Sequence, residues 1–275
     1  MLLGVSSFAF TWGVRQGVPP VDEQSLIAFA RHHGLDALQL GDNLPVHEMA
    51  STRRAALRTA AVEAGLRLEL GARGLTRDHL DRYLDLACEL DSPLLRFVVD
   101  SDGHEPDAAW IIETLRWACP RLEAAKVILA LENHDRFGAA ELRAMIDAVK
   151  SPYIGICLDT ANSLGAGEGL EFVTYWLAPV TVNLHVKDVT IRRVPSQMGF
   201  VIEGCTLGKG RLPIRHALEQ VWTAGRCASV ILEAWTSLAG TTAETVQHEL
   251  SEAEQSLEVL RAWMGSREAE RRDRR

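Results

Sequence analysis

Short apolar runs rich in Val, Ile and Leu alternate along this chain with longer stretches in which apolar residues recur at helical spacing. Such alternation is typical of parallel strands joined by helical crossovers. Several runs are apolar at nearly every position, as expected of strands covered on both faces. The pattern predicts eight strands, at Leu2–Ser6, Ala37–Gly41, Arg67–Gly71, Leu94–Val99, Val127–Glu132, Ile154–Asp159, Val180–Val186 and Val230–Glu233.

The stretches between these runs carry signals for the start and end of helices. Residues 21–33 and 52–64 have helical spacing, and each stretch is followed by a glycine suited to a left-handed cap. Pro106 and Pro213 open two further helices, and the last helix begins near Thr242. We expect one barrel domain over residues 1–264, followed by a charged, aperiodic and disordered tail over residues 265–275.

Eight such units are compatible with an open doubly wound sheet or with a closed barrel, and the polar residues favour the barrel. The last four predicted strands each end in a possible metal ligand: Glu132, Asp159, His185 and Glu233. In a barrel the carboxyl ends of successive strands converge on one mouth, whereas an open sheet gathers its ligands at a single switch point. The sequence therefore predicts an α/β fold, a single (β/α)8 TIM barrel.

These four strand-end residues also predict the cofactor. Any one carboxylate alone is more simply explained as a solvated strand end, but four consecutive strand ends favour a site. Three carboxylates and one imidazole suit one divalent metal ion, Mn²⁺, Mg²⁺, Co²⁺ or Zn²⁺, with positions open for substrate oxygens.

Side chains two positions apart share a face of a strand, and this rule sorts the neighbours of the ligands. His134 lies on the side of Glu132, and Lys187 lies on the side of His185. Both are therefore predicted to reach into the mouth. Asn133 and Asp188 point outward, where they support the site or cap a turn, and Arg96 either pairs with a carboxylate inside the barrel or has a purely structural role.

Aromatic and polar residues at other strand ends are candidates for substrate contact. Phe8, Phe10 and Trp12 alternate after the first strand, and Trp235 lies two residues beyond Glu233. We expect Phe10 and Trp235 to pack against the C–H face of a sugar, although aromatic residues at barrel ends often fill the core instead. His47, together with Asp42 and Asn43, is predicted to bind substrate hydroxyls.

Composition narrows the range of partners. The 275 residues carry a net charge of -8, which does not provide the positive field that nucleic acid or an anionic membrane requires. The apolar start has no basic region of a signal peptide, so we expect a cytoplasmic protein. A small molecule is the predicted partner; a homo-oligomer is compatible with the sequence, but no interface signature is visible.

The four strand-end motifs LALENH, ICLDTAN, NLHVKD and ILEAW resemble those of the xylose-isomerase-like barrel family, which includes sugar isomerases, ketose 3-epimerases and hydroxypyruvate isomerase. The resemblance covers nearly the whole chain. It implies that Glu132 and Glu233 bind the metal and also exchange protons with the carbon beside a carbonyl. With Lys187 beside them, they are the candidate catalytic residues.

Two departures from the family pattern affect the predicted chemistry. Asn162 stands where the family often has a histidine, so it is expected to bind a substrate oxygen but not to shuttle a proton. The segment from Arg192 to Gly210 resembles a flexible lid with more cations than a neutral ketose requires. Lys187, Arg192 and Lys209 either hold a substrate carboxylate or phosphate, or pair with Glu203 and Asp188 at the surface.

The leading hypothesis is a metal-dependent isomerase or epimerase acting on a small ketose or keto-sugar acid through a metal-stabilised enediolate. The alternative is a lyase on the same site, either a decarboxylase of a 3-oxo sugar acid or a keto-polyol dehydratase. Asn162 and the cationic segment favour the alternative. The chain lacks histidine ligands that an apurinic-site endonuclease requires, which disfavours that function. A non-catalytic sugar-binding barrel is the weakest of the hypotheses.

Overall fold

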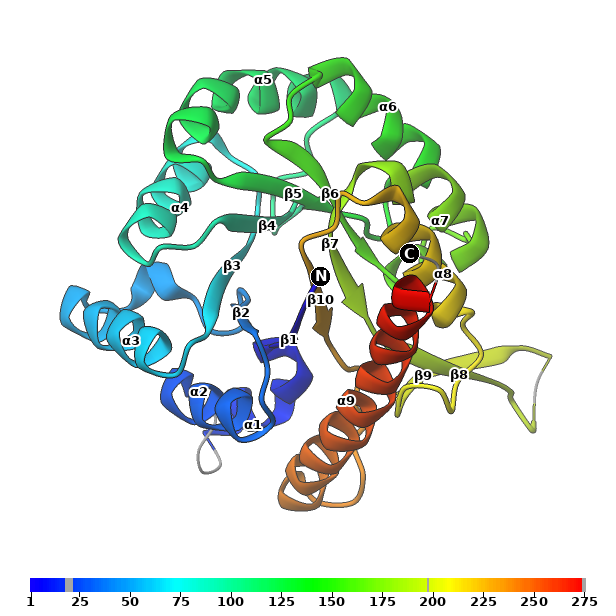
Figure 1. Ribbon diagram of the computed structural model, residues 1–275. Helices are drawn as coiled ribbons and strands as arrows, with labels where there is room; N and C mark the ends of the chain where they lie inside the picture. The colour runs from blue at the N-terminus through cyan, green and yellow to red at the C-terminus, as the bar shows by residue number, and fades with distance from the viewer. Residues whose placement is uncertain (18–21, 197, 274–275) are drawn as a thin grey trace.

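A computed structural model describes residues 1–17, 22–196 and 198–273, except for the side chains of residues 266–273. Eight parallel strands close into a barrel in the order β1-β10-β7-β6-β5-β4-β3-β2 (Figure 1). The closed order confirms the (β/α)8 barrel and rules out the open sheet. The strands are β1 (Leu2–Ser6), β2 (Ala37–Leu40), β3 (Arg67–Arg73), β4 (Leu94–Val98), β5 (Ile128–Glu132), β6 (Ile154–Asp159), β7 (Thr181–Val186) and β10 (Ser229–Leu232).

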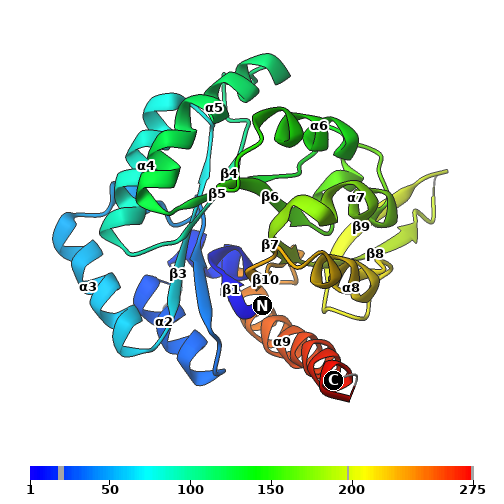
Figure 2. The same cartoon turned by 45° about the horizontal axis from the view of Figure 1, so that its top comes forward.

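Helices surround the barrel and cover the outer face of its strands (Figure 2). Leu, Ile, Val and Ala side chains of strands and helices meet in one buried core cluster, which is the main source of the barrel's stability. The helices are α1 (Thr11–Gln16), α2 (Glu23–His32), α3 (Ser51–Glu63), α4 (Arg77–Glu89), α5 (Ala108–Ala125), α6 (Ala139–Val149), α7 (Leu170–Leu177), α8 (Ile214–Ala224) and α9 (Thr242–Asp273).

The ends of two predicted elements differ from the structure. α2 begins at Glu23, after the capping residue Asp22, and the predicted start at residue 21 lies outside the described residues. The last helix does not stop at Gly265 but continues to Asp273, so that stretch is helical where we expected disorder. Its Arg, Glu and Ala residues are strong helix formers, which outweigh one glycine. The boundary of the barrel domain stays a prediction.

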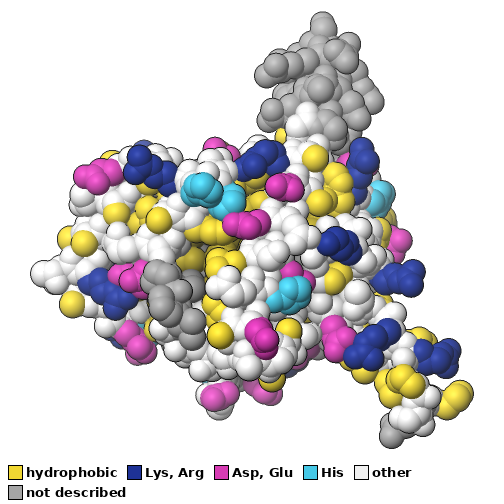
Figure 3. Space-filling model, turned by 90° about the horizontal axis from the view of Figure 1, so that it is seen from below, with side chains coloured by type: hydrophobic (Ala, Val, Ile, Leu, Met, Phe, Trp, Pro, Cys, Tyr) yellow, Lys and Arg dark blue, Asp and Glu magenta, His cyan; other side chains and the backbone are white. Residues whose placement is uncertain are grey.

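The segment expected to be a flexible lid is an ordered hairpin. Strands β8 (Asp188–Arg193) and β9 (Phe200–Cys205) pair antiparallel along their whole length and project from the barrel (Figure 1). Apolar and polar residues alternate in β8 from Asp188 to Arg192, and Ile191 stands opposite Ile202 of β9, which begins with three apolar residues. That period of two favours strand pairing over an irregular loop. Figure 3 shows the projection at the lower right, with basic and hydrophobic side chains on it.

Helix α9 connects helix α1 with the loop that follows β10. The carboxylate of Glu249 accepts the backbone N–H groups of Trp12 (2.8 Å) and Gly13 (3.0 Å). The indole of Trp12 donates to the carbonyl of Thr236 (2.8 Å), and the hydroxyl of Thr236 donates to Glu252 (2.9 Å). These bonds hold the ends of the first and last barrel strands against one helix.

No helix among the described residues combines the length and the apolarity needed to cross a bilayer.

Candidate metal centre and substrate pocket

The four predicted ligands converge at the carboxyl ends of neighbouring barrel strands. Glu132 ends β5, Asp159 ends β6, His185 lies in β7, and Glu233 follows β10. One donor atom from each residue lies within 4.8 Å of the others, and all four side chains are buried. Because parallel strands end at the same edge, a sequence pattern spread over about a hundred positions becomes one cluster in space.

The polar atoms of this cluster fit a divalent cation. Glu132 Oε2, Asp159 Oδ2, Glu233 Oε1 and both ring nitrogens of His185 are buried and make no well-aligned hydrogen bond among the described residues. The three oxygens and His185 Nδ1 each lie within ion-pair distance of an oppositely charged group, whereas His185 Nε2 has no such neighbour. Buried polar atoms are nearly always bonded, so this group of atoms, and His185 Nε2 above all, has capacity for a further partner. Carboxylate oxygens and an imidazole nitrogen are suitable ligands for a divalent metal ion.

Cys157 is a second possible neighbour of such an ion, because its sulfur lies within reach of Glu132 and His185. Its thiol, however, donates to Asn183 Oδ1 (3.2 Å) in the barrel interior. Burial raises the pKa of the Cys157 thiol to about 12 in the absence of an ion, which disfavours the thiolate form that a metal ligand requires. The three carboxylates with His185 therefore form the better ligand set.

Two buried cations compensate the carboxylates. Arg96 Nε lies 2.8 Å from Glu132 Oε2, and Lys187 Nζ lies 3.0 Å from both Asp159 and Glu233. Burial favours neutral carboxyl groups, but Arg96 and His185 outweigh it and lower the pKa of Glu132 to about 2. His185 and Lys187 likewise outweigh burial and hold the pKa of Glu233 well below its usual range.

Asp159 behaves differently from the two glutamates. Burial raises the pKa of Asp159, and the charges of Glu132 and Glu233 add to this effect against the opposing charge of Lys187. The three carboxylates thus carry more negative charge than Arg96 and Lys187 neutralise. This excess of negative charge favours the binding of a further cation.

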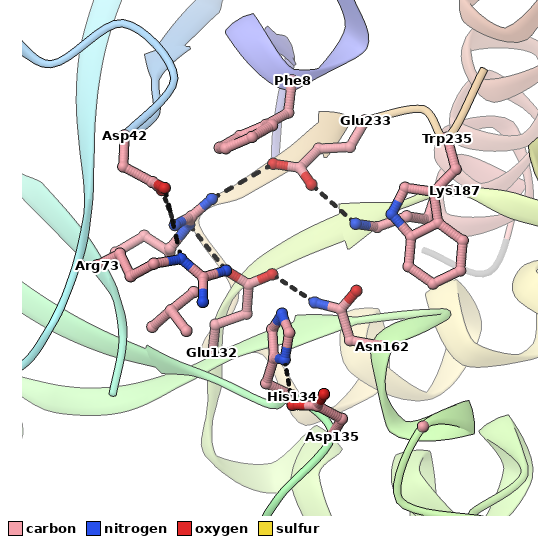
Figure 4. Close-up of a pocket in the computed structure, with 13 residues that line it drawn as sticks. Phe8, Asp42, Arg73, Glu132, His134, Asp135, Asn162, Lys187, Glu233 and Trp235 are labelled. Carbon is pink, nitrogen blue, oxygen red and sulfur yellow. Dashed lines mark hydrogen bonds and ion pairs between the residues drawn. The ribbon is translucent and has the colours of Figure 1, made fainter. Parts of the chain in front are cut away.

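A cavity of about 350 Å³ opens above the ligands, small enough for a sugar-sized molecule. Asn162 donates to Glu132 Oε1 (2.8 Å), and the ring of Trp235 packs with its centre 5.0 Å from Lys187 Nζ (Figure 4). The cavity is lined by Phe8, Asp42, Arg73, Arg96, Val98, Glu132, His134, Asp135, Asn162, Gly165, Lys187, Glu233 and Trp235. Four of the predicted site residues outside the ligand set, His134, Asn162, Lys187 and Trp235, are thus in the pocket.

Two predicted substrate contacts lie elsewhere. Phe10 is only 1% exposed and packs against Phe29, with ring centres 4.9 Å apart. The strand alternation fails here because β1 ends at Ser6 and the chain enters a short 3-10 helix (Ser7–Phe10), which turns Phe8 into the pocket instead. His47 lies outside the pocket lining, and its Nδ1 is 2.9 Å from the hydroxyl of Tyr83.

The structure also places the cations of the hairpin segment away from the pocket. Arg192 pairs with Glu203 across the hairpin, with Nε 2.9 Å from Oε2. Lys209 donates to Gln255 of α9 (2.8 Å). The surface-pairing alternative therefore describes Arg192 alone, because Lys209 bonds an amide and Lys187 faces the pocket. A substrate contact by Arg192 would need the hairpin to move.

Sequence reasoning missed Arg73 and Asp135 as pocket residues. Asp135 follows β5 and lies 2.6 Å from His134 Nδ1. Arg73 ends β3, two residues beyond the predicted end of that strand at Gly71. Extending the alternation from Gly71 by two positions would have found Arg73, because both residues share a face.

Asp188 caps the segment after the hairpin, as its outward position predicts. Its carboxylate accepts the backbone N–H groups of Gly208 (3.0 Å), Gly210 (3.0 Å) and Leu212 (3.3 Å). A Cβ on Gly210 would stand 2.0 Å from Asp188 Oδ1, so the glycine permits this close approach. The glycines of this segment therefore serve a fixed turn at this position.

Replacing this carboxylate tests its capping role. We expect Asp188→Ala to lower the free energy of unfolding by about 3 kcal/mol, because three backbone N–H groups lose a buried acceptor. Asp188→Asn keeps one acceptor oxygen and should lose clearly less. Urea denaturation of both variants measures the difference, and equal stability of the two would contradict the capping role.

Comparison of the chain with known proteins agrees with the closed barrel. Residues 27–263 match the model of the xylose isomerase-like TIM barrel family. The chain belongs to this family. The match confirms the resemblance inferred from the four strand-end motifs.

Within the xylose isomerase-like family, the chain is 33% identical over 261 residues to 3-oxo-isoapionate decarboxylase of Pectobacterium atrosepticum, covering 94% of this chain and 95% of the relative. D-psicose 3-epimerase of Clostridium cellulolyticum H10, solved with D-tagatose, has a TM-score of 0.70 at 18% identity, covering 96% of this chain and 98% of that one. A family member from Mycobacterium smegmatis in complex with magnesium has a TM-score of 0.63 at 18% identity, with coverage of 85% and 89%. The two structural similarities show the shared fold.

Proposed function

We propose that this protein is a divalent-metal-dependent decarboxylase of a small 3-oxo sugar acid. The charge of the centre carries the proposal. Glu132, Asp159 and Glu233 with Arg96 and Lys187 sum to -1 when all five are ionised and His185 is a neutral imidazole, the form that binds a metal ion. A divalent ion would change this sum to +1, which suits an anionic substrate better than a neutral ketose.

The relative at 33% identity supports the same choice, since it is a decarboxylase of a 3-oxo acid and spans nearly the whole chain. The ketose 3-epimerase is 18% identical and supports only the fold. The proposal therefore reverses the order of the two hypotheses drawn from the sequence. The lyase alternative becomes the first candidate.

The proposed reaction breaks the bond between the carboxylate and the carbon beside the carbonyl. The electron pair of that bond stays on the substrate, CO2 leaves, and the carbon takes up one proton. A divalent ion held by Glu132, Asp159, His185 and Glu233 would supply a Lewis acid for the carbonyl and neighbouring hydroxyl oxygens.

The other pocket residues have distinct roles in this proposal. Lys187 faces the cavity, so its ammonium stabilises negative charge on the substrate. Burial lowers the pKa of Lys187, but Asp159 and Glu233 outweigh burial and raise it, so the proton comes from solvent. Asn162 orients Glu132 through its 2.8 Å hydrogen bond and cannot transfer a proton. Phe8 and Trp235 provide apolar walls that limit access of water.

An isomerase or epimerase is the second candidate, and one observation favours it. Glu132 and Glu233 both approach His185 Nδ1, at 3.6 Å and 3.1 Å. Two carboxylates around one centre would allow one glutamate to remove a proton and the other to return it. No such pair is needed when a carboxylate leaves.

Incubation in D2O with Mn²⁺ or Mg²⁺ separates the two reactions. With a panel of four- to six-carbon 3-oxo sugar acids we expect stoichiometric CO2 and one solvent-derived deuterium in the ketose product. The background is the spontaneous loss of CO2 measured with Asp159→Asn protein prepared in parallel. Deuterium incorporated into neutral ketoses, with no CO2 above background from any acid, would instead establish the epimerase.

A further inference from the structure

Arg73 stands at the mouth of the pocket with its hydrogen-bonding capacity unused. In the β3–β4 pairing it lies beside Val98, and both residues line the cavity. Its side chain is 41% exposed. Among the described residues Arg73 has an ion pair with Asp42, at 3.5 Å, and donates no hydrogen bond. A guanidinium has five N–H donors, so this side chain is able to bind a further anion.

The other two pocket cations are committed to buried carboxylates. Arg96 lies 2.8 Å from Glu132 and 3.1 Å from Asp42, and Lys187 bridges Asp159 and Glu233. The carboxylate of Asp42 is therefore shared between two guanidinium groups, those of Arg73 and Arg96. Arg73 also interacts electrostatically with Asp135, but its side chain is far more exposed than those of Arg96 and Lys187, so it is the cation that a ligand reaches first.

The chain makes room for these two arginines with a glycine. A Cβ on Gly71 would stand 3.2 Å from the Cα of Gly41 and 3.5 Å from Cζ of Arg96. The first contact is tighter than an ordinary van der Waals contact, so a larger residue at position 71 would push against the wall that holds Arg96. With glycine there, Arg96 lies deep in the barrel and Arg73 lies above it, toward solvent.

The two sides of the pocket differ in chemistry, as Figure 4 shows. Arg73 and Asp42 lie on one side, and Lys187 with Trp235 lies on the other. His134 and Asp135 contribute an imidazole and a carboxylate that suit sugar hydroxyls. Only the Arg73 side presents an exposed guanidinium, the group that binds a carboxylate through two parallel hydrogen bonds.

We propose that Arg73 binds the carboxylate of the sugar-acid substrate and makes the pocket selective for acids over neutral ketoses. This inference rests on the proposed decarboxylase function and specifies which residue recognises the departing group. A carboxylate held at the mouth leaves the carbonyl and hydroxyl end of the substrate for the metal centre. When the carbon–carbon bond breaks, its electron pair stays with the carbonyl fragment, and the neutral CO2 loses its attraction to Arg73 beside the exit.

The test compares binding of non-reacting aldonates of four to six carbons with binding of the matching neutral alditols. Calorimetry in Mn²⁺ should show the Kd of the aldonates rising about 30-fold or more in Arg73→Met, the low end of the cost of breaking a charge pair. Alditol binding should stay within about 3-fold. Arg73→Lys should recover part of the aldonate affinity, because it restores the charge but not the planar fork.

Arg215→Met is the matched control, since Arg215 is an exposed arginine of α8 that pairs with Glu219. It should bind both ligand classes like the unchanged protein. Aldonate affinity unaltered in Arg73→Met, or no aldonate binding to the unchanged protein, would overturn the role of Arg73.

Turnover distinguishes this failure from failure of the proposed function. If the unchanged protein releases CO2 and Arg73→Met does so with the same KM, the function stands and the assignment of Arg73 is wrong. If Arg73→Met loses aldonate affinity while the unchanged protein releases no CO2 from any acid, the carboxylate site stands and the reaction is wrong. If both proposals are right, Arg73→Met raises KM for the acid more than it lowers kcat.

Discussion

Glu233→Gln is expected to lower kcat by about 1,000-fold or more while leaving the barrel folded. Glu233 lies 3.1 Å from His185 and 3.0 Å from Lys187, so its charge acts on both the ligand set and the pocket ammonium. Glutamine keeps the size of the side chain and one oxygen, but it removes a negative charge from the centre. The loss should therefore persist when the divalent ion is saturating.

The measurement is kcat with the best 3-oxo acid over a range of Mn²⁺ concentrations, together with the circular dichroism spectrum. Glu113→Gln, which makes the same chemical change on the exposed surface of α5, should retain full activity. Activity of Glu233→Gln within about 10-fold of the unchanged protein would remove Glu233 from the chemistry.

Removal of divalent ions is expected to abolish turnover and to lower Tm by about 10 °C without unfolding the protein at 25 °C. An ion present at 1,000 times its Kd stabilises the folded state by about 4 kcal/mol, and each kcal/mol shifts Tm by a few degrees in a chain of this size. Folding should survive because Arg96 and Lys187 already neutralise much of the carboxylate charge.

Two matched aspartate variants make this result specific. Asp159→Asn removes a proposed ligand. We expect the affinity of this variant for Mn²⁺ to fall by more than the roughly 10–100-fold that is typical when a residue hydrogen-bonded to a ligand is replaced. Asp135→Asn removes a carboxylate from the rim of the same pocket and should retain about one ion per chain. Elemental analysis after dialysis measures both, and equal metal content in the two variants would contradict the proposed ligand set.

The barrel and the ligand cluster were accessible from the sequence for a simple physical reason. Parallel strands bury both faces, so their apolar runs are visible, and their carboxyl ends meet at one mouth. Glu132, Asp159 and Glu233 each follow such a run, and the structure brings them together with His185. Whether these residues bind a metal and carry out the reaction stays a proposal.

The sequence pattern failed where the backbone leaves regular strand geometry. Phe10 was assigned by alternation through a segment that forms a 3-10 helix, so Phe8 took its place in the pocket. Arg73 was missed because the apolar run ends at Gly71 although the strand continues to Arg73. Strand pairing with β4, which depends on distant residues, determines that extension.

The hairpin was missed for a different reason. Its glycines and charges were interpreted as a mobile segment, but Gly210 permits the approach of Asp188, and Arg192 pairs with Glu203 across the two strands. These contacts join residues that a local pattern does not relate. Composition alone thus indicated that this segment is distinctive, but it did not predict the hairpin.

Helix α9 influences the shape of the pocket without contacting the substrate. Through Glu249 and Glu252, this helix holds α1, which follows Phe8, and the loop that contains Trp235, although none of its described side chains lines the cavity. The spacing between the two aromatic walls is thereby set by a segment more than two hundred positions away from the first of them. Changes in that helix are a route by which related barrels can come to accept substrates of different breadth while every residue that touches the substrate stays the same.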